Sequence, residues 1–244
     1  CLDDPNVQLI IPHIKRRRVT YGMTAQADIS AHNITYNDHF GSHFTVWKGD
    51  DVLGDIALPV PGKHNVYNAL AATAVGLELD VPFEKIAEAF ARFKNANRRF
   101  QFKGEARGIT VVDDYGHHPT EILATLAAAK NGSGGKRTVV VFQPHRYTRT
   151  QELFDEFALA FNNADVLFVL DIYAASETPI EGINAEVLTE NIKKYGHKNV
   201  TYIGDIENAS EKVIPILQDG DLLITLGAGT VTRLSDEILE KLKK

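Results

Sequence analysis

The sequence predicts an α/β protein in which a mostly parallel sheet, covered by helices on both faces, follows a smaller α/β segment. Two observations support this prediction. After residue 108, five apolar runs alternate with five helical stretches, which is typical of a buried parallel sheet. Before residue 94, short runs with alternating apolar and polar residues lead into two helical stretches. The polar run KNANRR at 94–99 separates the two patterns and is the predicted domain boundary.

In the first segment, the alternating runs within residues 19–60 predict consecutive strands in antiparallel hairpins, because the turn signals NDHFG and KGDD separate them. The stretch PGKHNVYNALAATAVGLEL then predicts a helix that has Pro61 and Gly62 at its start. Residues 82–93 predict a second, amphipathic helix with apolar residues at helical spacing.

In the second segment, the runs GITVVDD, RTVVVFQ, DVLFVLD, NVTYIG and DLLITLG predict the parallel strands. Helices are predicted near residues 120–131, 150–163, 184–195, 207–217 and 231–243. Ligands of such sheets bind beyond the carboxyl ends of the strands. The loops to consider are therefore 113–119, 142–149, 171–182 and 226–230.

Composition excludes several classes of protein. The formal net charge is −6 over 244 residues, and neither half is basic enough to suggest binding to nucleic acid. No apolar run approaches the roughly 18 residues of a membrane helix, and the first ten residues do not resemble a signal peptide. A single cysteine suits the reducing cytoplasm. Because the chain starts at Cys1 and has Met23 as its one methionine, we expect it to be a piece of a longer polypeptide.

The run DDYGHHPTE concentrates ionisable side chains where a strand ends and Pro119 suits the start of a helix. A lone Asp or His there would most simply cap the helix or lie in solvent. Two acids and two imidazoles within six positions instead favour a polar pocket for a nucleotide or an amine substrate. A metal site is the alternative, but four ligands so close in sequence rarely converge on one ion.

Three other stretches place polar side chains near the predicted ligand edge or a helix start. In FQPHRYTRT, Arg146 and Arg149 are one helical turn apart, and guanidinium groups suit carboxylates and phosphates. In GKHNVYNALAA, Asn65 and Asn68 share a face of the first helical turns, where anions are favoured. The arginines of NRRF are either hinge residues that reach a phosphate or surface charges, and the sequence favours neither.

Two further stretches are similar to known binding motifs but are not predicted to bind a ligand. The basic run KRRR at 15–18 is predicted to be a solvated strand edge. LGAGTVT at 226–232 is similar to a dinucleotide fingerprint, but it follows the last strand and has Thr232 at the third glycine position. We therefore expect a tight strand-to-helix turn.

These stretches, in this order and over essentially all of the chain, closely resemble the Mur ligases of peptidoglycan synthesis. Within the family they are most similar to the members that add L-alanine to UDP-N-acetylmuramate. The resemblance implies residues 1–97 as the latter part of an α/β ATPase domain, and 98–244 as the Rossmann-like domain that binds the amino acid. It further implies a cytoplasmic enzyme in which ATP phosphorylates the muramate carboxylate and the alanine amine attacks the acyl phosphate.

The resemblance also implies roles for individual residues. His64, Asn65 and Asn68 correspond to residues near the adenine and ATP, Arg99 to the arginine that reaches the γ-phosphate, and Asp114 to an acid that contacts the nucleotide. The remaining residues fall where the amino acid and the muramate end meet: His117, His118, His145, Arg146 and Arg149. One of these imidazoles would accept the ammonium proton, and the sequence does not show which one.

The sequence also departs from the family pattern. It contains no phosphate-binding GxxxxGK[ST] loop, and the family's ligands for Mg²⁺ would precede Cys1, so no metal-binding residue is predicted here. We therefore expect no ligase activity from these residues alone. Two alternatives stay open: a murein peptide ligase, which recycles an intact tripeptide, and a catalytically silent nucleotide-binding module.

Overall fold

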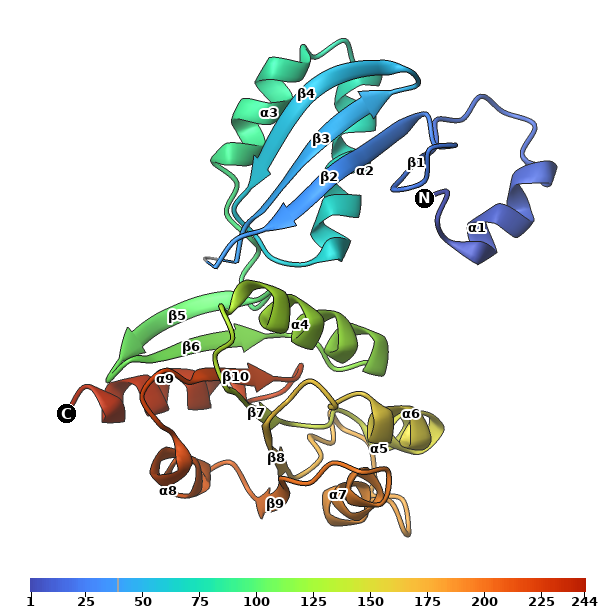
Figure 1. Cartoon of the computed structure of the whole chain (residues 1–244). Helices are drawn as coiled ribbons and strands as arrows, with labels where there is room; N and C mark the ends of the chain where they lie inside the picture. The colour runs from blue at the N-terminus through green and yellow to red at the C-terminus, as the bar shows by residue number, and fades with distance from the viewer. Residues whose placement is uncertain (39) are drawn as a thin grey trace. The chain divides into compact units, whose positions relative to one another are not determined.

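A computed structural model describes residues 1–38 and 40–244 (Figure 1). His39, which belongs to the predicted turn NDHFG, lies outside the described residues. The contacts divide the chain into two compact units, residues 1–94 and 95–244. None of the described helices is both long and apolar enough to cross a membrane.

The first unit holds, within its described residues, a four-stranded sheet in the order β1–β2–β3–β4. Strands β2 (Ile29–Tyr36), β3 (Ser42–Lys48) and β4 (Asp51–Leu58) are antiparallel, as the sequence predicts, and β1 (Tyr21–Gly22) runs parallel to β2. Short α1 (Pro5–Ile10) and η1 (Ile11–His13) precede them. The basic run 15–18 is an exposed loop rather than the predicted strand edge.

Two helices complete the first unit's core. Helix α2 (Lys63–Glu78) starts after Gly62, whose φ of 95° few other residues adopt, and α3 (Phe83–Ala91) follows it. Both helices bury apolar side chains against the sheet, among them Leu70 and Phe83 against Phe44 and Ile56. The helices predicted within 61–79 and 82–93 are therefore confirmed.

The second unit is a six-stranded sheet in the order β5–β6–β10–β7–β8–β9 (Figure 1). Strands β6 (Ile109–Asp114), β7 (Thr138–Phe142), β8 (Val166–Leu170), β9 (Val200–Gly204) and β10 (Leu222–Leu226) are parallel and correspond to the five predicted runs. Strand β5 (Gln101–Ala106), which the sequence analysis missed, pairs antiparallel with β6 at the edge.

Helices cover both faces of this sheet. Helices α4 (Pro119–Gly132), α5 (Tyr147–Glu152), α6 (Phe154–Leu159) and α7 (Ala185–Lys194) connect strands that follow one another in one direction across the sheet. Helix α8 (Ala209–Val213), with η2 (Ile214–Ile216), and helix α9 (Thr232–Leu242) pack together over the strands' other face. The predicted helix at 150–163 is instead two short helices that break at Leu153.

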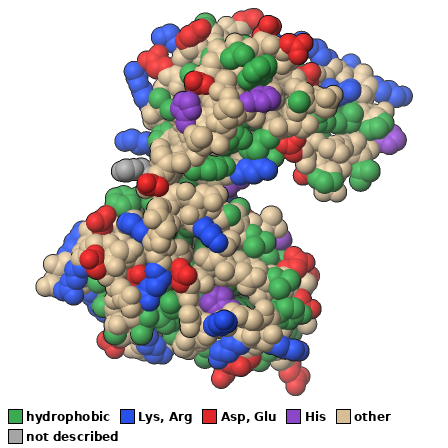
Figure 2. Space-filling model, viewed as in Figure 1, with side chains coloured by type: hydrophobic (Ala, Val, Ile, Leu, Met, Phe, Trp, Pro, Cys, Tyr) green, Lys and Arg blue, Asp and Glu red, His purple; other side chains and the backbone are tan. Residues whose placement is uncertain are grey.

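Charges are mixed on the surface. On the face shown in Figure 2, acidic and basic side chains are interspersed. The carboxyl ends of β6, β7, β8 and β10 meet at one edge of the second sheet, and their loops contain the predicted substrate residues.

Candidate functional site

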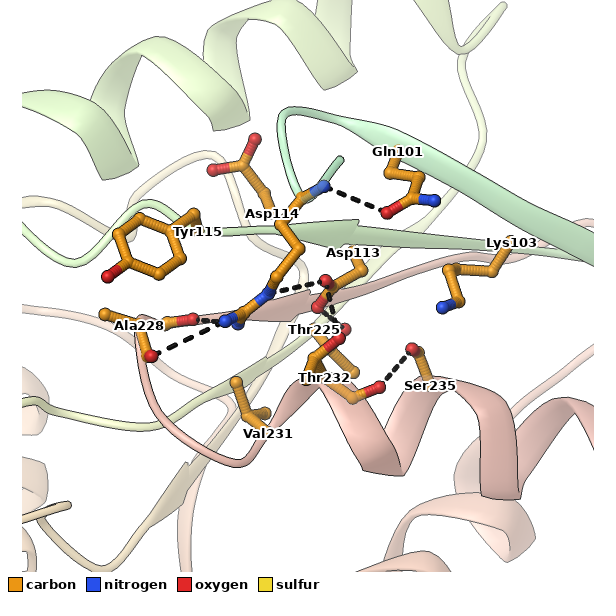
Figure 3. Close-up of polar contacts among 12 residues, drawn as sticks. Gln101, Lys103, Asp113, Asp114, Tyr115, Thr225, Ala228, Val231, Thr232 and Ser235 are labelled. Atoms are coloured by element: carbon orange, nitrogen blue, oxygen red, sulfur yellow. Dashed lines mark hydrogen bonds and ion pairs between the residues drawn. The ribbon is translucent and has the colours of Figure 1, made fainter. Parts of the chain in front are cut away.

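The two adjacent aspartates at the end of β6 are turned into the protein. The side chain of Asp113 is completely buried, and it accepts hydrogen bonds from Thr225 Oγ1 at 2.8 Å and Thr232 Oγ1 at 2.9 Å. Its third partner is the Nε of Arg98, at 3.0 Å (Figure 3). All three hydrogen bonds join Asp113 to other parts of the second unit, so its carboxylate anchors neighbouring elements. The predicted polar pocket around the two acids stays a prediction.

Asp114 is also buried, and it accepts from the backbone N–H of Phe100 at 2.6 Å and of Gly116 at 2.7 Å. Thr125 Oγ1 donates to the same carboxylate at 3.2 Å. Burial raises the pKa of Asp114, although these hydrogen bonds and nearby Arg99 oppose the rise. The described contacts make Asp114 an anchor for two loops, and the predicted contact with a nucleotide stays a prediction.

The two histidines after β6 lie at the start of α4. His118 is the N-cap residue: its Nδ1 accepts from Thr120 N at 3.3 Å. Glu121 completes a capping box, because its Oε2 accepts from the backbone N–H groups of His117, at 3.0 Å, and His118, at 3.2 Å. Burial opposes ionisation of Glu121, but these bonds and the neighbouring His117 and Arg99 hold its pKa below the ordinary value. The helix-capping explanation therefore holds for His118.

Four rings form a row along the carboxyl edge. Tyr115 meets His117 edge to face with centroids 5.3 Å apart, and His117 lies 5.7 Å from the ring of His145. His145 in turn stacks on Tyr173 at 5.4 Å. Burial, followed by the electrostatic effect of His117, Arg149 and Arg146, lowers the pKa of His145. At neutral pH this site therefore favours an uncharged imidazole at His145.

The two predicted arginines that follow β7, Arg146 and Arg149, contact different partners. Arg149 lies in α5 and its Nη1 donates to the carbonyl of His145 at 3.0 Å, with His145 Nδ1 at 3.2 Å. Arg146 precedes α5 with a left-handed φ of 73°, and its Nη1 is 3.7 Å from Glu177 Oε1. Glu177 also accepts from Thr148 Oγ1 and Thr148 N, and these bonds lower its pKa.

Arg99 projects from the segment that leads into β5. Its side chain is 51% exposed, and its Nη1 lies 3.5 Å from Glu121 Oε1. A weak, exposed ion pair of this kind leaves the guanidinium able to bind an anion. Arg98, the preceding residue, is 21% exposed and held by Asp113. The structure thus separates the two arginines that the sequence analysis considered together.

Three residues of the edge are not among the predicted site residues. Tyr173 and Glu177 lie in the loop 171–182, for which the sequence predicts no individual site residue. A parallel bridge between His145 and Tyr173 joins the two loops, and Arg146 N donates to Tyr173 O at 2.8 Å. Arg98 precedes the predicted Arg99 in NRRF. The sequence signal for Tyr173 and Glu177 is their position after a predicted strand.

The remaining predicted residues lie in the first unit, at the start of α2. Asn65 donates from Nδ2 to Pro61 O at 2.7 Å, and Asn68 Nδ2 lies 3.3 Å from Asn65 Oδ1. His64 and Asn68 are exposed. No side chain caps the first turn of α2. Across the described residues, 1–38 and 40–244, no group of three His, Cys, Asp or Glu side chains is placed to hold a metal ion.

Two family models match the chain. The model of the Mur ligase glutamate ligase domain matches residues 98–229, which include Tyr115, His117, His145 and Tyr173. The chain belongs to the Mur ligase family. A second model, that of the Mur ligase middle domain, matches residues 1–76.

Individual Mur ligases agree with this assignment. A UDP-N-acetylmuramate–L-alanine ligase from Pelobacter propionicus is 52% identical over all 244 residues, which are 53% of its length. The chain thus spans about half the length of the curated relatives it matches. The crystal structure of a UDP-N-acetylmuramate–alanine ligase from Thermotoga maritima has a TM-score of 0.78 at 28% identity, over 91% of this chain and 47% of that one. MurF ligase of Thermotoga maritima, solved with ADP, shares the fold with a TM-score of 0.69 at 18% identity, over 99% of this chain and 52% of that one.

Proposed function

We propose that the full-length protein containing this chain is an ADP-forming ligase that adds L-alanine to UDP-N-acetylmuramate in peptidoglycan synthesis. The observation that carries the proposal is the cluster of imidazole and guanidinium groups at the carboxyl edge of the second unit, formed by His117, His145 and Arg149. It occurs in a chain that is 52% identical to a relative of that name.

The proposed reaction has two steps. ATP transfers its γ-phosphoryl group to the muramate carboxylate, which releases ADP and leaves an acyl phosphate. The alanine amine then loses a proton and attacks the acyl carbon, and the tetrahedral intermediate expels inorganic phosphate. Both steps develop negative charge on oxygen, which fixed guanidinium groups stabilise. We assign Arg99 to the phosphoryl oxygens, and Arg146 and Arg149 to the carboxylate of the amino acid.

We further propose His117 as the group that accepts the ammonium proton. Its Nδ1 lies 3.0 Å from the carbonyl oxygen of Tyr115, so in the neutral ring this nitrogen carries the proton and Nε2 keeps its lone pair. His145 Nδ1 instead faces a donor, Arg149 Nη1. Donation from that group would leave the proton of neutral His145 on Nε2. We assign substrate positioning to His145, which Arg149 holds, and to His118, which caps the start of α4.

We assign His64, Asn65 and Asn68 to the adenine side of ATP. The fit is partial, because the amide nitrogen of Asn65 is already bonded to Pro61 O, whereas exposed Asn68 can contact a base. We propose Mg²⁺ as the metal that neutralises the phosphates when bound, with its ligands outside the described residues. We assign residues 1–97 to the ATP-binding domain and residues 98–244 to the amino-acid-binding domain. We propose that the protein acts in the cytoplasm.

The direct test measures ADP release by the full-length protein with UDP-N-acetylmuramate and either L-alanine or a peptidoglycan tripeptide. We expect turnover with L-alanine. A preference for the tripeptide would identify a murein peptide ligase, and no turnover with either acceptor would favour a silent nucleotide-binding module. The 244-residue chain alone should give no turnover, because its sequence lacks the phosphate-binding loop. Activity of the chain near that of the full-length protein would contradict this part of the proposal.

A further inference from the structure

Arg98 contacts three separate parts of the second unit with one guanidinium group. Its Nε donates to Asp113 at the end of β6. Its Nη2 donates to the carbonyl oxygen of Gly227, and its Nη1 lies 3.4 Å from that of Ala228, both in the turn between β10 and α9. Its Cζ lies 4.9 Å from the ring centroid of Tyr115, within cation–π distance.

The buried partner of Arg98 cannot easily change position. Asp113 is completely buried, and its other two hydrogen bonds come from Thr225 and Thr232. A buried carboxylate that loses its cation is strongly destabilised, so the ion pair fixes the arginine as firmly as the acid. Lysine cannot replace these contacts, because it lacks the planar fork that donates in several directions at once.

The backbone around Arg98 is held in an unusual conformation. Arg98 has a φ of 59° and Phe100 a φ of 45°, and such left-handed conformations are uncommon for residues other than glycine. Arg98 N donates to Gln101 Oε1 at 2.9 Å, and Phe100 N donates to Asp114. Arg99 lies between these two fixed residues. Its side chain is 51% exposed, and its Cζ lies 5.9 Å from the ring centroid of Tyr115.

Arg98 also sets the position of the ring row, the four neighbouring rings of Tyr115, His117, His145 and Tyr173. The N–H of Tyr115 donates to the carbonyl oxygen of Arg98 at 2.6 Å, and the Tyr115 ring rests against the guanidinium. The same ring meets His117 edge to face, and His117 continues to His145. Displacement of the arginine would thus move Tyr115 first and His117 with it.

We propose that Arg98 is a positioning residue: it ties the segment before β5 to the β10–α9 turn, which fixes Tyr115 and His117 at the carboxyl edge and keeps Arg99 exposed. The effect of Arg98 on catalysis rests on the proposed function. Its effect on the positions of Tyr115 and His117 does not, and it can be tested in the 244-residue chain.

A second arginine serves as the matched control. Arg137 pairs with buried Asp221 through Nε and Nη2 and donates to the carbonyl oxygen of Ile216. Arg137 precedes β7 and Asp221 precedes β10, so this pair lies at the opposite, amino end of the same sheet. Loss of either arginine removes a similar set of bonds, and only loss of Arg98 should affect the ring row.

The experiment compares Arg98→Lys, Arg98→Gln and Arg137→Lys in the 244-residue chain by NMR. The His117 ring signals, assigned with a His117→Gln variant, report the edge-to-face contact with Tyr115 through its ring current. We expect these signals to shift in both Arg98 variants and to stay in place in Arg137→Lys. Amide exchange at Phe100 and Tyr115 should accelerate about tenfold or more in the Arg98 variants. Each variant loses the hydrogen bond from the Arg98 guanidinium to the charged Asp113, which weakens this part of the structure. Unchanged His117 signals and exchange rates in folded Arg98→Lys would overturn the proposal.

Kinetics of the full-length protein then separate this role from stability. Arg98→Lys should lower kcat for alanine-dependent ADP release by about tenfold and change KM for L-alanine much less, because it displaces His117, the proposed proton acceptor. Arg137→Lys should change neither. Equal effects of the two variants on kcat would reduce Arg98 to a stabilising residue and refute positioning. If the unmodified protein shows no alanine-dependent activity, the proposed function fails, while the NMR comparison still decides the geometry.

Discussion

Asp114 shows what adjacent polar residues at the end of a strand can do besides bind a ligand. Its carboxylate accepts from Phe100 N, Gly116 N and Thr125 Oγ1, which belong to three different parts of the chain. The sequence placed Asp113 and Asp114 correctly at a strand end. It could not show the direction of their side chains. A carboxylate that holds two loops together and a carboxylate that binds a ligand can occupy the same position at the end of a strand.

Replacement of Asp114 by Ala should lower the free energy of unfolding by about 3 kcal/mol, because it leaves buried donors without an acceptor. Urea unfolding of the variant measures this loss. Glu207→Ala, which removes an exposed carboxylate, is the control and should change stability by less than about 0.5 kcal/mol. A loss for Asp114→Ala as small as that of the control would show that the three hydrogen bonds contribute nothing.

His197 should make the chain less stable in mild acid. It is buried, its Nε2 lies 3.0 Å from the carbonyl oxygen of Ala164, and burial lowers its pKa despite that contact and nearby Asp165. The unfolded chain therefore binds more protons than the folded chain below the ordinary value of 6.5, so stability falls as the pH drops through that region. Unfolding free energies at pH 8 and pH about 5.5 should differ less in His197→Gln than in the unmodified chain. An identical pH dependence of the two proteins would contradict this assignment.

At the scale of elements, the strand-to-helix turn after β10 is the tightest feature of the carboxyl edge. Gly227 has a φ of 145°, and a Cβ there would lie 2.6 Å from the backbone oxygen of Gln143. The sequence predicted a turn at this place from its position in the chain. It did not predict that Gln143 Oε1 would accept from Val231 N at the start of the following helix.

Gly227→Ala should therefore destabilise the chain more than Gly135→Ala. Gly135 also has a positive φ, 85°, but a Cβ there meets nothing within 4 Å. The control should lose about 1 kcal/mol through backbone strain, and Gly227→Ala about 2 kcal/mol more, because the clash is with backbone. Thermal unfolding of both variants provides the comparison. Equal losses would mean that strain alone, without close packing, explains the glycine.

Two differences between the predicted and observed elements have physical causes. Strand β5 contains no buried residue and carries Gly104 at a bulge, so it offered no apolar run to recognise. The break between α5 and α6 at Leu153 has no Gly or Pro in the stretch QELFDEF to announce it. The five buried strands were predictable because apolar residues occupy nearly all their positions.

At the scale of the whole molecule, the chain consists of two units joined by the exposed residues 91–94. The sequence located the boundary to within a few residues from the polar run KNANRR. It could not show that residues 95–100 are bonded to the second unit, because these bonds join Arg98 and Phe100 to aspartates that follow them by 14 or 15 positions.

Limited trypsin digestion should consequently cut after Arg92 or Lys94 before it cuts after Arg98 or Arg99. Proteases need an exposed segment that can adapt to their active site, and the bonds of Arg98 and Phe100 restrain the second pair. Trypsin also cuts in the exposed run 15–18, so the informative fragments are those that contain the second unit and start after it. Mass spectrometry of these fragments identifies the site, and we expect one that starts at Phe93 or Asn95. A fragment that starts at Arg99 or Phe100 would show that this segment is not held by the second unit.

We propose that the carboxyl edge of the second unit binds the amino acid in the full-length protein. Steady-state kinetics of Arg146→Ala with varied L-alanine measure this, with Arg137→Ala as the control at the other end of the sheet. We expect kcat/KM for L-alanine to fall by about tenfold to a hundredfold in Arg146→Ala, through loss of a bond to the carboxylate. An undiminished kcat/KM in Arg146→Ala would show that this edge does not bind the amino acid.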